Sequence, residues 1–189
     1  MNSRGRAFTY KLCGGVDPSV RKPELYTAEV DGMTFELRLV YIADDDLGFI
    51  NQCTHQWDEF ASNMHREPYL SVAISNSGQT FIVSVGHEPV CVVEVHHALQ
   101  YYVGEEFLPK ESDYFMRIFF SANTRSNVNA ALLHFLTDYC SQFEEVGGLI
   151  IKADNLDEHL LVQSGFIAHE DAGGKKTGIY YYSTSKENV

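Results

Sequence analysis

Two side chains that could move protons stand close together in an apolar stretch of the chain. Glu94 and His96 lie two residues apart in a run rich in valine, so in a β-strand both would point to the same face. A carboxylate or a neutral imidazole in that position could accept a proton from an attacking nucleophile. The residues leave two other interpretations open, a solvent-facing strand residue for Glu94 and an ordinary strand-end histidine for His96.

A second feature with chemical meaning is the joint between an apolar stretch, 114–120, and a run with leucines at helical spacing. Residues 122–129 of this joint are rich in Asn, Ser and Thr, which suit turns and helix starts. The first N–H groups of a helix have no partner within the helix, so a helix start can hold a pyrophosphate. The joint therefore indicates a phosphate-binding site, to which Arg125 would add positive charge.

The composition narrows the class of protein. With 189 residues and 44% hydrophobic side chains, the chain is long and apolar enough for one domain with a packed core. A formal charge of -12 argues against binding to nucleic acid or to an anionic membrane. The four cysteines form no C-x-x-C pair, no apolar run approaches the roughly 20 residues of a membrane span, and residues 1–8 lack the apolar core of a secretory signal. We therefore expect a cytoplasmic protein with reduced thiols.

Hydrophobic periodicity and turn residues predict the order of the elements. Helical spacing predicts helices at 44–52, 55–65 and 128–143, the last stopped by Gly147-Gly148, and one from Asn155 or Asp157 to Gln163, ended by Gly165. The pattern of period two and short apolar runs predict strands at 25–30, 34–41, 80–85, 90–97, 114–120, 149–152, 166–169 and 178–183, with turns at Asp31-Gly32 and at 86–89.

This order resembles that of the GNAT N-acetyltransferase superfamily over about residues 34–183. The residues that carry the resemblance are the joint at 121–129 and the segment Leu156–Phe166, which closes with Ser164-Gly165-Phe166. Within the superfamily the chain looks most like the acyltransferases of siderophore assembly. Those proteins carry a Glu before a long aromatic connection and an Asp opening the next strand; here these are Glu94, the connection with Tyr101 and Tyr102, and Asp113.

The resemblance implies an α+β fold with a mixed, mostly antiparallel twisted sheet and helices on both faces. It implies a V-shaped split between the fourth and fifth strands of the core, 114–120 and 149–152, in which acetyl-CoA would lie as co-substrate. Residues 1–33 would be an N-terminal extension with a hairpin arm, 34–183 a single acyltransferase domain, and 184–189 a tail. No metal is implied, and His96 and His97, on opposite faces of a strand, lack a third ligand.

The resemblance also assigns the site residues. The strand that ends at Phe119 and Phe120 would pair with the pantetheine arm through its backbone. Glu94 or His96 would be the base, and Asp113 could orient the substrate amine or cap a turn. The pyrophosphate would rest on the helix start, at Arg125, Ser126, Asn127, Val128, Asn129 and Ala130.

Three positions depart from the superfamily pattern. Its phosphate loop reads Arg/Gln-x-x-Gly-x-Gly/Ala, whereas residues 124–129 contain no glycine. Many members carry a Tyr four residues before the closing Gly, where this chain has Leu161, and leucine cannot protonate a thiolate. The siderophore relatives carry a His four residues after the Asp, where this chain has Arg117.

Three functions therefore stay open from the sequence. The first is an acyl-CoA-dependent N-acyltransferase that moves an acetyl group to a primary amine of a small molecule. The second is a catalytically degenerate GNAT-fold binding or interaction module, and the third is an enzyme with a different donor. The acidic chain would steer a cationic amine. Residues 1–33 could add an edge strand, cover the cleft or pair with a second subunit in a homodimer.

Overall fold

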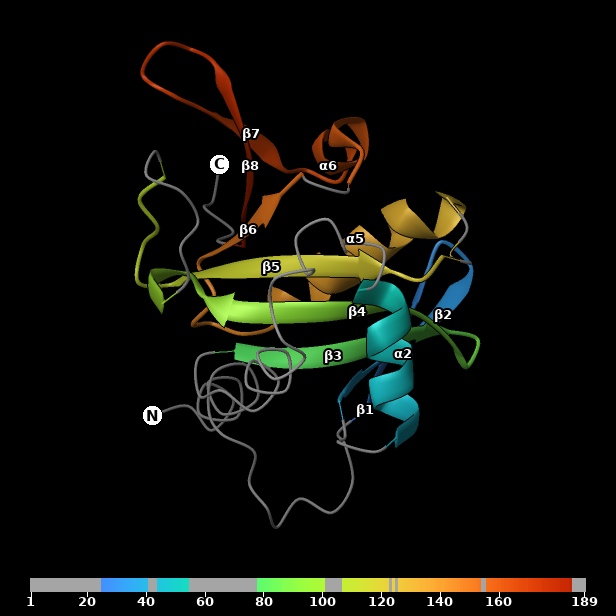
Figure 1. Cartoon of the computed structure of the whole chain (residues 1–189). Helices are drawn as coiled ribbons and strands as arrows, with labels where there is room; N and C mark the ends of the chain where they lie inside the picture. Colours follow the sequence, from blue (N-terminus) through green and yellow to red (C-terminus); the bar gives the residue numbers. More distant parts are fainter. Residues whose placement is uncertain are drawn as a thin grey trace.

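The computed structural model describes residues 25–40, 44–54, 78–100, 107–122, 124, 126–153 and 156–184. These residues form an eight-stranded sheet in the order β1-β2-β3-β4-β5-β6-β8-β7 (Figure 1). All neighbouring strands are antiparallel except β5 and β6. The predicted α+β fold with a mixed, mostly antiparallel sheet is confirmed. The strands are β1 (Leu25–Val30), β2 (Met33–Leu39), β3 (Gly78–Val85), β4 (Glu88–His97), β5 (Asp113–Phe120), β6 (Gly148–Lys152), β7 (Ile167–Glu170) and β8 (Lys176–Ser183); the helices are α2 (Asp44–Thr54), α5 (Ser126–Cys140), α6 (Glu158–Gln163) and the 3-10 turn η2 (Ala98–Gln100).

Two tight turns join the first four strands in pairs, β1 with β2 and β3 with β4. Asp31-Gly32 joins β1 to β2 with φ of 52° and 74°, and Gly86-His87 joins β3 to β4 with φ of 55° and 72°. Two successive residues with positive φ match the right-handed twist of the flanking strands. The predicted turn at 86–89 is therefore too long, because Gly86-His87 alone closes the hairpin and β4 starts at Glu88. β1 lies at the edge of the sheet, one of the roles proposed for the N-terminal extension.

Helix α2 lies over β4 and β5 on one face of the sheet. Its Ile50 and Cys53 pack in a buried cluster with Val92 of β4 and Phe119 of β5. The start of α2 is tied to β2 by a two-bond ion pair, in which Arg38 Nη1 and Nη2 lie 2.8 Å and 2.5 Å from the two carboxylate oxygens of Asp46. The predicted helix at 55–65 lies outside the described residues.

Helix α5 covers the opposite face, where it contacts β1, β2 and α6. Leu132, Phe135 and Leu136 of α5 are fully buried in the main core. The predicted end of this helix at residue 143, with Gly147-Gly148 as the stop signal, is wrong. The helix ends at Cys140, because the N–H groups of Gln142 and Phe143 bond to carbonyls three residues back and tighten the chain into turns. Among the described residues no helix is long and apolar enough to cross a membrane.

The only parallel pair in the described sheet is short. β5 and β6 pair from Asp113–Met116 to Gly148–Ile151, although β5 continues to Phe120. Figure 1 shows β6 and β8 turning away from the plane of β3, β4 and β5. This pattern agrees with the split expected between the fourth and fifth strands of the core, and it leaves the last four residues of β5 without a β6 ladder partner among the described residues.

Gly147 and Gly148 bring the start of β6 close to its neighbours. A Cβ atom on Gly148 would overlap the ring and hydroxyl of Tyr181, and one on Gly147 would overlap the Ser112 side chain. These glycines are therefore explained by close approach between strands rather than by a helix end.

We expect Gly148→Ala to lower the free energy of unfolding by about 1–3 kcal/mol, because the added methyl group displaces the Tyr181 ring from a packed position. Gly48→Ala is the matched control, since Gly48 is exposed within α2 with no atom near its missing Cβ. The control should raise stability by roughly 0.5–1 kcal/mol. Urea denaturation measures both variants, and equal stabilities would contradict the close-packing argument.

Candidate functional site

A row of polar side chains crosses one face of the sheet. The register pairs Thr80 of β3 with Glu94 of β4, and Glu94 with Arg117 of β5. Lys152 of β6 occupies the position after the Met116–Ile151 pair, and by the alternation of a strand it shares the face of Ile150. We call Thr80, Glu94, Arg117 and Lys152 the polar row.

Apolar clusters flank the polar row on the same face. Towards α2 lies the cluster that contains Val92 and Phe119. Towards the other end of β4 and β5 lies a second cluster, formed by Ala98, Phe115, Ile150 and Ile179 with Phe107 and Tyr181 packed against it. Charged groups between two apolar clusters lose water and need partners. The row therefore crosses the face between two apolar clusters.

Glu94 is enclosed by two nitrogen-bearing side chains. Glu94 is 1% exposed, and its Oε2 lies 3.3 Å from Arg117 Nη1 and 3.7 Å from His96 Nε2. His96 is itself buried, with 5% exposure. The interpretation of Glu94 as a solvent-facing strand residue is therefore wrong. The structure brings Glu94 and His96 together, as their spacing predicted, and adds Arg117 to them.

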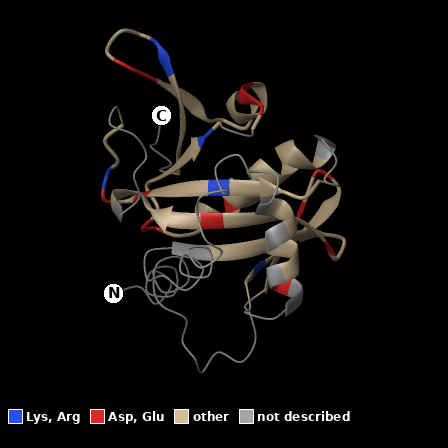
Figure 2. Ribbon diagram, viewed as in Figure 1, with Lys and Arg blue, Asp and Glu red and all other residues tan. Residues whose placement is uncertain are grey.

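Arg117 connects the buried carboxylate to the surface. Its side chain is 31% exposed, whereas that of Glu94 is 2% exposed. The guanidinium carbon also lies 4.7 Å from the centre of the Phe119 ring, a cation–π geometry. Figure 2 shows the blue segment of β5 beside the red segment of β4. An incoming molecule would therefore meet the positive guanidinium of Arg117 rather than the buried carboxylate of Glu94.

Asp113 lies apart from these residues, at the far end of β5. One carboxylate oxygen accepts the N–H of Lys110 at 2.8 Å, and the other accepts the Tyr181 hydroxyl at 3.3 Å. Burial and the Asp113 carboxylate raise the pKa of Tyr181. Asp113 stands four residues before Arg117, or ~13 Å along a strand. Its contacts fit the turn-capping role, and the structure does not bring it to Glu94.

The joint before α5 is tied to the neighbouring strand. The Thr124 hydroxyl donates to the Val90 carbonyl at 2.6 Å, and its N–H donates to the Ser121 carbonyl at 2.9 Å. The first turn of α5 contains no acidic residue. Asn129 Oδ1 is buried there without a hydrogen-bond partner in the structure. Asn129 Oδ1 is a hydrogen-bond acceptor and offers nothing to an anion, so the features that favour an anionic ligand here are the helix N–H groups and the lack of acidic side chains in the first turn.

The other residues predicted to contact the cofactor fall into three groups: buried residues, half-buried residues and residues outside the described part of the chain. Val128 is 7% exposed and packs into the main core, as Phe119 packs into the α2 cluster. Phe120 and Ala130 are half-buried. Arg125, the side chains of Ser126 and Asn127, and both Tyr101 and Tyr102 lie outside the described residues.

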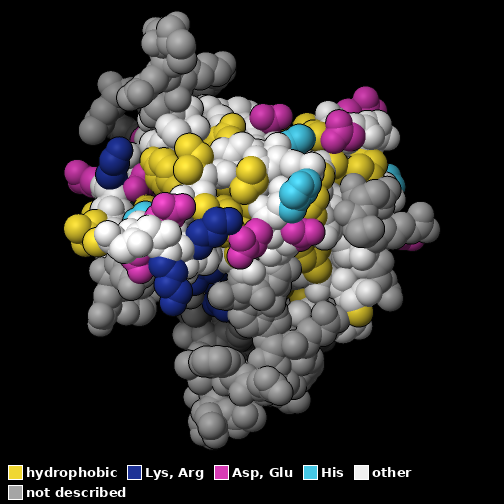
Figure 3. Space-filling view, turned by 90° about the horizontal axis from the view of Figure 1, so that it is seen from above, with side chains coloured by type: hydrophobic (Ala, Val, Ile, Leu, Met, Phe, Trp, Pro, Cys, Tyr) yellow, Lys and Arg dark blue, Asp and Glu magenta, His cyan; other side chains and the backbone are white. Residues whose placement is uncertain are grey.

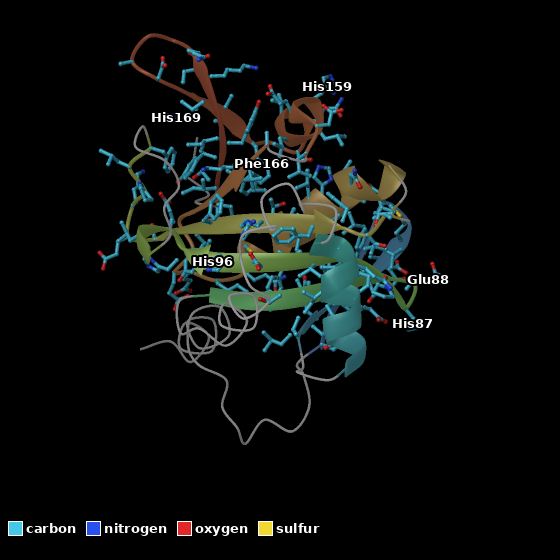
Figure 4. The ribbon with its side chains drawn as sticks, in the orientation of Figure 1. His87, Glu88, His96, His159, Phe166 and His169 are labelled. Carbon is cyan, nitrogen blue, oxygen red and sulfur yellow. The ribbon has the colours of Figure 1, made fainter. Side chains whose placement is uncertain are left out.

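Three further histidines and the three cysteines of the described residues do not extend the site. Figure 4 shows His159 and His169 at the α6–β8 end of the sheet and His87 at the opposite hairpin tip, away from His96. The described residues contain no group of three or more metal-ligating side chains. Burial raises the pKa of Cys53 to about 11 and that of Cys140 to about 12, and it also raises the pKa of Cys91. These thiols are protonated at neutral pH and are poor nucleophiles.

Comparisons with known proteins identify the fold. No family model and no curated protein matches the sequence. Among solved structures, an uncharacterised protein from Bacillus halodurans matches with a TM-score of 0.66 and 11% identity, over 85% of this chain and 90% of that chain. The aminoglycoside acetyltransferase AAC(6')-Ib in complex with coenzyme A and kanamycin matches with a TM-score of 0.59 and 16% identity, over 79% and 94%. The N-acetyltransferase PseH of Campylobacter jejuni in complex with acetyl coenzyme A matches with a TM-score of 0.54 and 13% identity, over 79% and 99%.

These identities are low, so the comparisons show the fold alone. The chain has the fold of the GNAT-type N-acetyltransferases, which supports the resemblance inferred from the order of its elements. The closer likeness to the siderophore acyltransferases stays a prediction. Sequence reasoning missed the polar row, since Thr80 and Lys152 carry no motif and only the register across four strands places them together.

We expect Arg117→Met to lower the free energy of unfolding by about 1–3 kcal/mol, because it leaves the buried Glu94 carboxylate without its guanidinium partner. Glu94→Gln on its own removes the buried charge and keeps the shape of the side chain. The double variant Glu94→Gln/Arg117→Met should therefore be more stable than Arg117→Met. Urea denaturation of the four proteins gives the coupling energy, and strictly additive effects would show that the pair is not coupled.

Proposed function

We propose that this chain is an acyl-CoA-dependent N-acyltransferase, which transfers an acetyl group from acetyl-CoA to a primary amine of a small molecule. The observation that carries the proposal is the end of β5 beyond its short ladder with β6, which leads to the start of α5, with Glu94 buried one strand away. Solved proteins of the same fold were crystallised with acetyl-CoA or coenzyme A, which supports this donor. The three buried, protonated thiols support a reducing compartment such as the cytoplasm.

The donor would lie along the end of β5. Beyond Met116, the backbone of Arg117–Phe120 has no β6 ladder partner among the described residues, so it could bond to an extended pantetheine arm. The pyrophosphate would then reach the first turn of α5, where helix N–H groups and the helix dipole favour negative charge.

The phosphate loop fits better when it is read one residue later. The superfamily pattern Arg/Gln-x-x-Gly-x-Gly/Ala then falls on residues 125–130, with Arg125 and Ala130 matching its ends and Val128 replacing the first glycine. Val128 turns its side chain into the main core. The valine side chain therefore does not point away from the core towards a ligand at the helix start, so the missing glycine does not by itself exclude coenzyme A.

The reaction would be a direct attack of the neutral amine nitrogen on the thioester carbonyl carbon. The carbon–sulfur bond breaks, the thiolate leaves, and the amine proton passes to Glu94, either directly or by way of His96 and water. Burial of Glu94 beside Arg117 and His96 fixes the carboxylate in one position. The leaving thiolate has no acid at the position where many members carry a Tyr, because the residue there is Leu161, which has no proton to donate and is buried in the core.

Leu161 also favours the second candidate, a GNAT-fold protein that binds a ligand or partner without catalysis. Such a protein would keep the fold and could keep the donor site, but it would show no turnover with any amine. We give preference to the enzyme, because a buried Glu94–Arg117–His96 cluster has a cost in free energy that a purely structural sheet avoids with apolar residues.

We expect acetyl-CoA and free coenzyme A to bind with micromolar affinity, as measured by calorimetric titration. Arg125→Ala should weaken both affinities by about tenfold or more, because a charge-assisted contact to phosphate is lost. Lys175→Ala is the matched control, since it removes one cation from an exposed loop. Absence of binding at millimolar ligand would overturn the acetyltransferase proposal and leave the second candidate.

We expect Glu94→Gln to lower kcat by about 100-fold or more with an accepted amine, and to leave the affinity for acetyl-CoA nearly unchanged. The amide cannot take the amine proton, but it keeps the size of the side chain. Circular dichroism and thermal unfolding check that the variant folds. Unchanged kcat in the folded variant would remove Glu94 from the role of base.

A further inference from the structure

We propose that Arg117 and Lys152 form a subsite for a carboxylate group of the substrate, an inference that rests on the proposed acyl transfer. The subsite lies at the end of the polar row, where the β5–β6 ladder stops. It would select substrates in which a carboxylate lies near the reacting amine or near the reacting thioester.

The two cations are placed by the parallel register. Phe115 pairs with Ile150 and Met116 with Ile151, so Arg117 and Lys152 are the next positions on their strands. Lys152 is also paired with Ile179 of β8, which belongs to the same apolar cluster as Phe115 and Ile150. Both registers therefore put Lys152 on the face that carries Arg117. Strands within a ladder lie ~4.8 Å apart, so Arg117 and Lys152 leave the same face of the sheet from neighbouring strands, a separation that one carboxylate could bridge.

Within the polar row two cations, Arg117 and Lys152, stand against the one carboxylate of Glu94, whereas the chain as a whole is acidic. Arg117 forms an ion pair with Glu94, whereas among the described residues no carboxylate forms an ion pair with Lys152. Lys152 is half-buried at the end of β6, next to an apolar cluster, so its charge is only partly screened by water. On the face seen in Figure 3, acidic and basic side chains are interspersed among the coloured residues.

The position of the subsite limits which anion it could hold. The pyrophosphate seat at the start of α5 follows the end of β5 at Phe120, while Arg117 lies three residues earlier, ~10 Å along the strand. Glu94, the proposed base, is the direct neighbour of Arg117. An anion at Arg117 and Lys152 would therefore lie beside the reacting groups rather than at the phosphates.

Two sources could supply such a carboxylate. It could belong to the acceptor, as in an amino acid whose side-chain amine is acylated, or to the far end of a dicarboxylic acyl group on the donor. Guanidinium and ammonium groups bind both in the same way, by charge-assisted hydrogen bonds. The experiment therefore has one arm for each source.

The acceptor arm compares lysine with 1,5-diaminopentane, its decarboxylated counterpart, in the presence of acetyl-CoA. The donor arm compares succinyl-CoA with acetyl-CoA in calorimetric titrations. In at least one arm we expect the compound with the extra carboxylate to be favoured about tenfold or more, by kcat/KM in the acceptor arm or by Kd in the donor arm. Lys152→Met, which keeps the aliphatic stem, should reduce that preference about tenfold, whereas the control Lys176→Met, in the exposed Lys176–Glu158 pair, should leave it unchanged.

No preference in either arm, or a preference that Lys152→Met leaves intact, would overturn the subsite. Failure of the proposed function is a separate result, because it would appear as absence of coenzyme A binding in the wild-type chain. In that case glutarate is titrated alone and followed by NMR chemical shifts. Binding that Lys152→Met abolishes and Lys176→Met retains would support the subsite, and absence of glutarate binding would overturn it.

Discussion

A carboxylate buried in an apolar sheet needs a cationic partner, and the ion pair between Glu94 and Arg117 meets that need at the centre of this molecule. Removing a charge from water costs several kcal/mol, which only close and well-oriented partners offset. The partner is close, with Arg117 Nη1 3.3 Å from Glu94 Oε2, because β4 and β5 pair in a register that sets the two residues opposite each other. Any slip of one residue between these strands would turn Arg117 to the other face and leave Glu94 unpaired. The pair therefore selects the register on which the rest of the polar row depends.

Much of the fold follows from local patterns in the sequence. Period-two alternation and the tight turns at Asp31-Gly32 and Gly86-His87 locate the strands, because both signals act between neighbouring residues. The end of α5 was predicted three residues too late, at 143 instead of Cys140, since Gly147-Gly148 resembles a helix stop while it serves close approach to Ser112 and Tyr181. That approach joins segments far apart along the chain, which no local pattern reveals.

The candidate site could likewise be predicted only where it depends on residues that are close together in the chain. The shared face of Glu94 and His96 could be predicted, because it depends only on two-residue spacing within one strand. Their partners could not, because the residues opposite Glu94 depend on how the connection between β4 and β5 sets the register. Arg117 was visible in the sequence only as the absence of an expected histidine. In the structure the guanidinium of Arg117 neutralises the buried charge of Glu94 and stacks on Phe119, and these two contacts explain an arginine at this position.

The charges on the chain act on a substrate at two distances, at long range and at contact range. At long range, a formal charge of -12 attracts an ammonium group and repels free carboxylates. At contact range, the cations of the polar row lie within an apolar surround, where screening by salt and water is weaker and a carboxylate is held more strongly. A substrate that carries both charges satisfies both conditions, since its ammonium end favours approach and its carboxylate end favours one orientation. In that orientation the amine to be acylated lies next to Glu94, so the charge that selects the substrate would also direct its proton to the proposed base.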